Sequence, residues 1–491
     1  MGGNMLNATT ATGAYTRKIA ELKAQSIVEI KFTEQDMGEI VAVHPQVSLS
    51  SAEASSGRIN YGGRLICTVV YAEGANLCRV QKGAEFSHHV DNDNLAPAQI
   101  CDCALSCEHT RVRREGSFYI VSVVVGASIT VSDSAERNYI QSLDGAIIRR
   151  EEGKLFNAVD FSGESEVDDD FNLVATDILV PSAQPVVLNC AVRSGLIEVS
   201  GEIYLSLLAV REGSPVALDR IIPFKAELSC ERAIVPSPAG CRAEIKDMTV
   251  DCKVNEERGK CEVTFNATLS FVGTLFEEEE VSFISDAFSA ENELKLDFCE
   301  EQSHVCTDVK VYSERVSGLC ATKAKLDYTC AFLAAALPRA EYALTQSGVE
   351  GSVSATLFFE QGGEIRTTEV NLPFSVNLSG LNSREGGVTV AVLGMSLRQR
   401  AEGECEAEAV LKIAVLDGER HTVRYLVGAE EGEKKAVNDS AISVYIPSAG
   451  DGLWETAKKL GCAPESIQKA NPELNFPLSG KERILIFRGK N

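Results

Sequence analysis

Three segments of the chain share one pattern, and this internal repeat restricts the fold more than any other feature of the sequence. They begin at Gly63, Gly201 and Gly351. In each, apolar side chains alternate with others, as in a half-buried β-strand, and a turn and a second strand follow. The second strand ends at a phenylalanine 23 residues after the glycine, namely Phe86, Phe224 or Phe374. The equal spacing predicts one β-hairpin that the chain uses three times.

Further alternating strands follow each phenylalanine, as at residues 101–107, 261–273 and 405–415. Short strands, Gly-rich turns and few helical patterns favour antiparallel sandwiches or barrels. We therefore predict a mainly β fold, with three antiparallel sandwich-like or barrel-like modules and a small C-terminal domain. The modules are expected at residues 26–150, 165–290 and 305–430, the last being the weakest copy.

The segments before and between these modules are predicted to be irregular. Residues 1–25 are expected to form a tail with a short helix at residues 16–25. Polar and acidic stretches are typical of linkers or solvated faces. They occur at residues 151–170, 290–305 and 428–440.

The charge of the chain disfavours two classes of partner. The net charge is −24, and a nucleic acid or an anionic lipid surface requires a basic protein face. Residues 441–491 differ, with seven Lys and Arg against five Asp and Glu, which leaves −26 for the other 440 residues. The sequence has no apolar run of about 18 residues, so we expect no transmembrane segment. It also lacks the apolar core of a secretory signal, and we expect a cytoplasmic protein.

Sixteen cysteines are expected to be reduced in that compartment. The strongest metal candidate is Cys101-x-Cys103-x3-Cys107, to which His88, His89 or His109 could add a fourth zinc ligand. However, Leu105 shares one strand face with these cysteines, and the third copy carries valines in the equivalent stretch. Cysteine packing as a small apolar residue explains the pattern without a metal, and we predict no metal site.

The sequence offers no catalytic arrangement. It contains no Walker A motif, no GxSxG, no HExxH and no EF-hand loop. Its six histidines are scattered, and none adjoins an evident nucleophile or carboxylate pair. We predict a non-enzymatic binding protein without a cofactor.

Residues 441–489 follow a βααβ pattern. A strand at 442–447 leads into a turn where Asp451 is placed to cap a helix. Leu453, Trp454, Ala457 and Leu460 form the apolar stripe of that helix, and Gly461 ends it. A second helix opens at Pro464 and ends at Asn471-Pro472, and residues 483–487 form the closing strand.

This C-terminal segment resembles the LysM domain in the string VYIPSAGDGLWETAKKLGCAPESIQKANPEL. Gly452 stands where that family usually has threonine. The resemblance implies a binding groove between two loops. Its positions here are Asp451, Gly452, Leu453, Pro472, Glu473, Leu474 and Asn475. Trp454 is expected in the core rather than as a ligand platform.

The upstream repeats resemble the SPOCS domain of spore-coat and envelope assembly proteins. The resemblance lies in QVSLSSAEASSGRINYGGRLICTVVY and ILVPSAQPVVLNCAVRSGLIEVSGEIYL. Three such modules followed by LysM are the layout of SipL-type proteins. That family is made in the mother cell, binds a coat morphogenetic ATPase (SpoIVA-like) and helps to tether the coat to the forespore surface. The resemblance implies the same scaffold function and the same place in the cell.

An alternative belongs to another class of function. LysM grooves generally bind N-acetylglucosamine polymers, so the C-terminal domain could bind peptidoglycan or the spore cortex. A cytosolic protein would rarely meet that polymer, which favours a protein partner.

Overall fold

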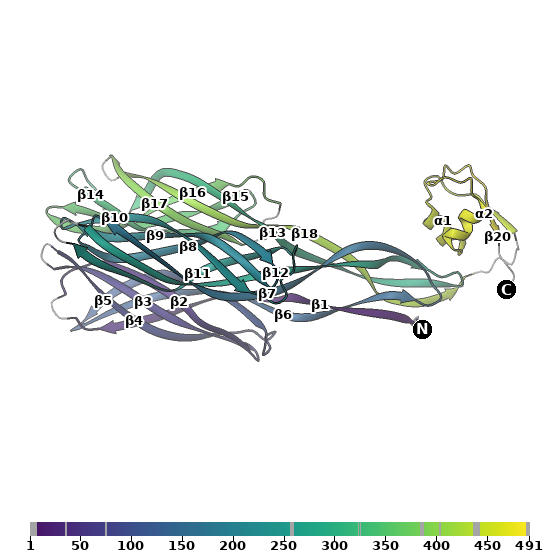
Figure 1. The fold of residues 1–491 in the computed structure, drawn as a ribbon, viewed down its shortest axis with the longest axis horizontal. Coiled ribbons are helices and arrows are strands. Elements are labelled where there is room, and N and C mark those ends of the chain that lie inside the picture. Colours follow the sequence, from purple (N-terminus) through teal and green to yellow (C-terminus); the bar gives the residue numbers. More distant parts are fainter. Residues whose placement is uncertain are drawn as a thin grey trace.

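The protein is described here by a computed structural model, which is mainly β and elongated (Figure 1). It describes residues 7–34, 37–73, 76–255, 260–322, 324, 326–382, 387–401, 404–435 and 442–487. Within these ranges, no helix has the length and apolar character needed to cross a membrane.

Eighteen strands form three successive sets of six. The first set is β1 (Ala8–Phe32), β2 (Ile40–Ser55), β3 (Arg58–Glu73), β4 (Asn76–Asp91), β5 (Ile100–Glu115) and β6 (Phe118–Leu143). The second is β7 (Ile147–Leu173), β8 (Asp177–Arg193), β9 (Leu196–Arg211), β10 (Ser214–Ser229), β11 (Ala239–Asn255) and β12 (Lys260–Phe288). The third is β13 (Asn292–Thr322), β14 (Ala331–Leu344), β15 (Gly348–Gln361), β16 (Glu364–Asn377), β17 (Val388–Ala401) and β18 (Glu404–Lys434).

Each set has the same strand pairing, and we call the three sets repeats 1, 2 and 3. Strands two to four form an antiparallel meander, while the sixth strand lies between the first and the fifth. In repeat 3, β13 also pairs with β16 at Thr322, which joins both layers into one six-stranded sheet. The predicted antiparallel β architecture is confirmed.

The hairpin predicted from the 23-residue spacing is present three times. Each repeat glycine lies directly opposite its phenylalanine on the neighbouring strand. The pairs are Gly63 with Phe86, Gly201 with Phe224 and Gly351 with Phe374. Identical register across three segments of different sequence shows that the spacing encodes a strand pairing.

The repeat glycine is required by close packing on both sides. A Cβ at Gly201 would lie 2.1 Å from the Val186 carbonyl oxygen on β8 and 2.5 Å from the Phe224 ring. At Gly63 and Gly351 it would lie 2.3 and 2.0 Å from a carbonyl oxygen of the preceding strand. Only glycine permits this approach of the two backbones.

The long strands extend beyond the body of the molecule as three two-stranded ribbons, which together we call the stalk (Figure 1). The ribbons pair residues 8–15 with 135–143, 147–157 with 277–288, and 292–303 with 421–434. Equivalent aromatic rings of β6, β12 and β18 meet inside it. The ring centroids of Tyr139, Phe283 and Tyr425 are 5.3, 5.9 and 6.2 Å apart.

The next residue of each strand continues this shared core. Ile140, Ile284 and Leu426 are each at most 4% exposed and belong to one cluster. A register shift follows each of them, so a β-bulge recurs at the same place in all three ribbons. The stalk is therefore held together by equivalent positions of the three repeats.

Three expectations about irregular segments are wrong. Residues 16–25 are not helical, because they lie within strand β1 and pair with β6. The acidic stretch 151–170 is not a linker but part of β7, and most of 290–305 lies in β13. Residues 428–434 belong to β18, while 436–440 lie outside the described residues. The predicted module ranges stay a prediction, but β7 and β13 cross their limits.

The expectation of reduced thiols is wrong at one pair. Cys252 and Cys261, on neighbouring strands β11 and β12, form a disulfide. The other fourteen cysteines are free, and several are buried, as Cys67 and Cys103 are. Cys103 packs with Leu105 and Ile129, as expected for cysteine in a sheet interior. Among the described residues, no group of three or more His, Cys, Asp and Glu could hold a metal ion.

Candidate binding surface of the C-terminal unit

The C-terminal unit has the predicted βααβ order. It consists of β19 (Ile442–Tyr445), α1 (Leu453–Leu460), α2 (Pro464–Ala470) and β20 (Ile484–Phe487). Gly461 ends α1 in the left-handed conformation, and Pro464 opens α2, both as predicted. Residues 441 and 488–489 of the predicted domain lie outside the described residues.

Asn471 fixes the second helix to the closing strand. Its side-chain amide donates to the carbonyl oxygens of Ile467 and Leu485, and its Oδ1 accepts from the Leu485 N–H at 2.7 Å. The residue is 2% exposed. The asparagine that ends α2 is therefore a structural link, which a sequence pattern alone does not reveal.

The structure brings the two predicted groove segments together. The Gly450 N–H donates to the Leu478 carbonyl at 2.7 Å, and the Leu478 N–H donates to the Asp451 carbonyl at 2.9 Å. Gly452 and Leu453 continue the first segment, and residues 472–475 lie in the loop between Asn471 and Leu478. Whether this loop pair binds a ligand stays a prediction.

Asp451 does not cap the first helix, contrary to expectation. The N-cap is Gly452, and no side chain caps α1. The Asp451 carboxylate instead accepts from the Ser448 N–H at 3.0 Å and from Lys459 Nζ at 2.8 Å. These contacts, that with Lys459 first, hold the pKa of Asp451 below its usual range. Its role is to close the loop before α1.

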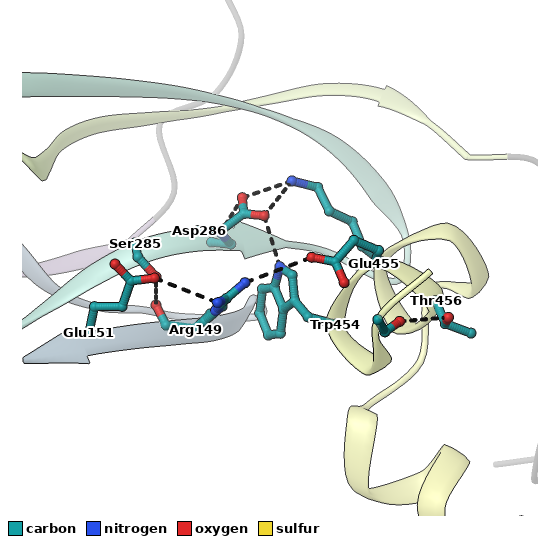
Figure 2. A network of polar contacts seen from close by, with 10 residues as sticks. Arg149, Glu151, Ser285, Asp286, Trp454, Glu455 and Thr456 are labelled. Carbon is teal, nitrogen blue, oxygen red and sulfur yellow. Dashed lines mark hydrogen bonds and ion pairs between the residues drawn. The ribbon is translucent and has the colours of Figure 1, made fainter. Parts of the chain in front are cut away.

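Trp454 connects the C-terminal unit to the stalk (Figure 2). Its indole N–H donates to Asp286 Oδ2 at 2.8 Å, and its ring meets Phe288 edge-on with centroids 5.1 Å apart. Lys458 Nζ lies 2.7 Å from the same carboxylate. Trp454 therefore belongs to a core, as expected, but that core is shared with β12 of repeat 2.

The contact selects one of three similar ribbon ends. Three residues beyond the stalk aromatics, β12 carries Asp286, whereas β6 carries Ser142 and β18 carries Gly428. Neither could accept the hydrogen bonds of Trp454 and Lys458 as a carboxylate does. Burial opposes ionisation of Asp286, but the bonds from Lys458 and Trp454 outweigh it and lower its pKa. A pair between Arg149 and Glu455, 3.8 Å apart, borders the contact.

The outer face of the β19–β20 hairpin is apolar and exposed, and we call it the outer hairpin face. Its residues are Ile442, Val444, Ile446, Leu485 and Phe487, which are 40–68% exposed. Ile442 pairs with Phe487 and Val444 with Leu485, so these side chains adjoin one another. Ile484 and Ile486 point inward and are at most 5% exposed. Contiguous exposed apolar side chains mark interaction sites more often than single ones.

Sequence reasoning missed this face, although a signal was present. A two-stranded hairpin that packs on helices buries only one face, so its strands should alternate apolar with polar residues. The closing strand is instead apolar at four consecutive positions, Ile484 to Phe487. This excess could have indicated a second surface to be covered.

A cavity of about 670 Å³ lies between the three repeats. Charged residues from repeats 1 and 2 meet at its wall, where Arg242 binds Asp102 with two hydrogen bonds and Glu244 at 3.2 Å. Burial raises the pKa of Glu244 and of Asp160. Since Arg242 joins β5 to β11, the cluster links two repeats, and this explains its position without a ligand.

No family model, no curated protein and no solved structure matches this chain.

Proposed function

We propose that the protein is a non-enzymatic scaffold of the spore envelope, whose C-terminal unit binds a coat morphogenetic ATPase. The outer hairpin face carries the proposal, because an exposed block of five apolar side chains needs a protein surface to cover it. The sequence resemblance to SPOCS and LysM modules supplies the class of partner. The mother-cell location and attachment of the coat to the forespore belong to the same proposal.

The attachment of the C-terminal unit supports this function. Trp454 and Lys458 both bind Asp286, so the unit is held at the far end of the stalk rather than against the body (Figure 1). A partner on the outer hairpin face would thus be placed at the end of a rigid support. Rigid presentation favours binding, because less conformational entropy is lost.

A capture experiment tests the proposal with a matched pair of variants. Val444→Asp places a charge in the outer hairpin face, whereas Val174→Asp makes the same change at an isolated surface position. The two valines are 56% and 51% exposed. Capture of the ATPase should fall with Val444→Asp and stay unchanged with Val174→Asp. Equal capture by both variants would remove this face from the function.

The glycan alternative is tested on the same purified protein. Calorimetric titration with N-acetylglucosamine oligomers measures binding without relying on Trp454, whose indole reports the contact with Asp286. Heat of binding that disappears in Leu474→Asp, within the predicted groove, would favour a peptidoglycan or cortex ligand. Absence of binding would leave the protein partner as the function of the C-terminal unit.

A further inference from the structure

Two cysteines of repeat 3 lie directly opposite each other on adjacent strands. Cys320, near the end of β13, pairs with Cys405, the second residue of β18. Their sulfur atoms are 3.2 Å apart. Cys320 Sγ also lies 3.1 Å from the Cys405 carbonyl oxygen, so its side chain is turned toward β18. Directly paired strand residues have Cα separations of about 4.5–5.5 Å, which fall within the range that a disulfide spans.

The same place in repeat 2 already carries a disulfide. Cys261 is the second residue of β12, as Cys405 is of β18, and it is bonded to Cys252 of the preceding strand β11. In repeat 3, the residue that pairs with Cys405 on the preceding strand β17 is Gln399. A cysteine stands on the strand at the other side instead. Both repeats thus place two sulfurs together at the end of the sixth strand, by different partners.

We propose that Cys320 and Cys405 are a site of reversible disulfide formation that closes repeat 3 covalently. The two residues are 85 positions apart, and the segment between them contains β14 to β17. The bond would therefore enclose the whole meander of the repeat. Closing a loop of this length restricts the unfolded chain more than closing the nine-residue separation of Cys252 and Cys261 does.

The chemistry needs a small-molecule disulfide, such as oxidised glutathione, as the oxidant. Cys320 is half-buried and reachable, whereas Cys405 is fully buried. The hydrogen bond from Cys405 lowers the pKa of the Cys320 thiol, and its thiolate attacks the small disulfide. A mixed disulfide forms and one small thiol leaves. Cys405 then attacks the Cys320 sulfur, and the second small thiol leaves, so two protons and two electrons pass to the oxidant.

Thiol mapping of the full-length protein tests the proposal. The protein is equilibrated in glutathione buffers of increasing oxidation, alkylated and analysed by peptide mass spectrometry. Oxidation should give a linked peptide pair containing Cys320 and Cys405, with loss of alkylation at both positions, and dithiothreitol should reverse it. The Cys252–Cys261 bond is read separately on other peptides.

Two variants and a second measurement complete the test. Cys320→Ser should leave Cys405 as a free thiol, whereas Cys78→Ser, at another partly exposed cysteine on β4, should not change the linked pair. The oxidised wild-type protein should also unfold at a higher urea concentration than the protein reduced at this pair. Cys320 that stays open to alkylation in the most oxidising buffer, or that stops at a mixed disulfide, would overturn the proposal. These outcomes do not depend on the partner of the C-terminal unit.

Discussion

Replacing Gly201 by alanine should destabilise repeat 2 by about 3 kcal/mol or more. The new Cβ would lie 2.1 Å from the Val186 carbonyl oxygen, where ordinary contacts begin at 3.4 Å, so the strands must separate by more than 1 Å. Overpacking of a core costs about 1–3 kcal/mol when side chains can adjust. Here a backbone atom blocks the methyl group, and each ladder hydrogen bond that is lost adds about 0.5–1.5 kcal/mol.

Urea unfolding followed by circular dichroism measures this effect. Gly83→Ala on β4 is the matched control, because its Cβ would meet nothing closer than 3.4 Å. The control should change the free energy of unfolding by less than about 1 kcal/mol, in either direction. Gly63→Ala and Gly351→Ala should resemble Gly201→Ala. Equal stability of Gly201→Ala and the control would refute the view that the repeat glycine is fixed by strand packing.

Three further predictions concern the stalk and the C-terminal unit. Phe283→Ala should lower the free energy of unfolding by about 3–5 kcal/mol, since the ring is 4% exposed, whereas Phe118→Ala, at a 39% exposed ring, should cost clearly less in the same urea experiment. The contact between Asp286 and Trp454 should be complete above the ordinary aspartate pKa of 3.8 and should be lost as the pH falls through the lower pKa of the docked carboxyl. Tryptophan fluorescence during acid titration measures this loss, and a transition that persists unchanged in Asp286→Asn would contradict the assignment. Asn471→Ala should destabilise the C-terminal unit by about 2–4 kcal/mol, because buried backbone groups of α2 and β20 lose their partners; amide hydrogen exchange of Leu485 as slow as in the wild type would contradict this.

Features that depend on neighbouring residues were predictable from the sequence. The alternation after each repeat glycine specifies strands, and the 23-residue spacing specifies the register of the hairpin. Pro464 and Gly461 mark helix ends through their own backbone preferences. Residues 16–25 were misjudged for the opposite reason. Their local pattern permits a helix, but pairing with the long strand β6 fixes them as strand, because tertiary contacts override weak propensity.

The sequence by itself determined that the chain has three equivalent β-repeats and a βααβ end, because these follow from spacing along the chain. Only the tertiary structure decided which distant groups meet: the aromatic core of the stalk, the docking of Trp454 on Asp286 and the opposition of Cys320 and Cys405. Such contacts join residues more than 80 positions apart. Their partners are chosen by the packing of whole strands, and no local pattern records that choice.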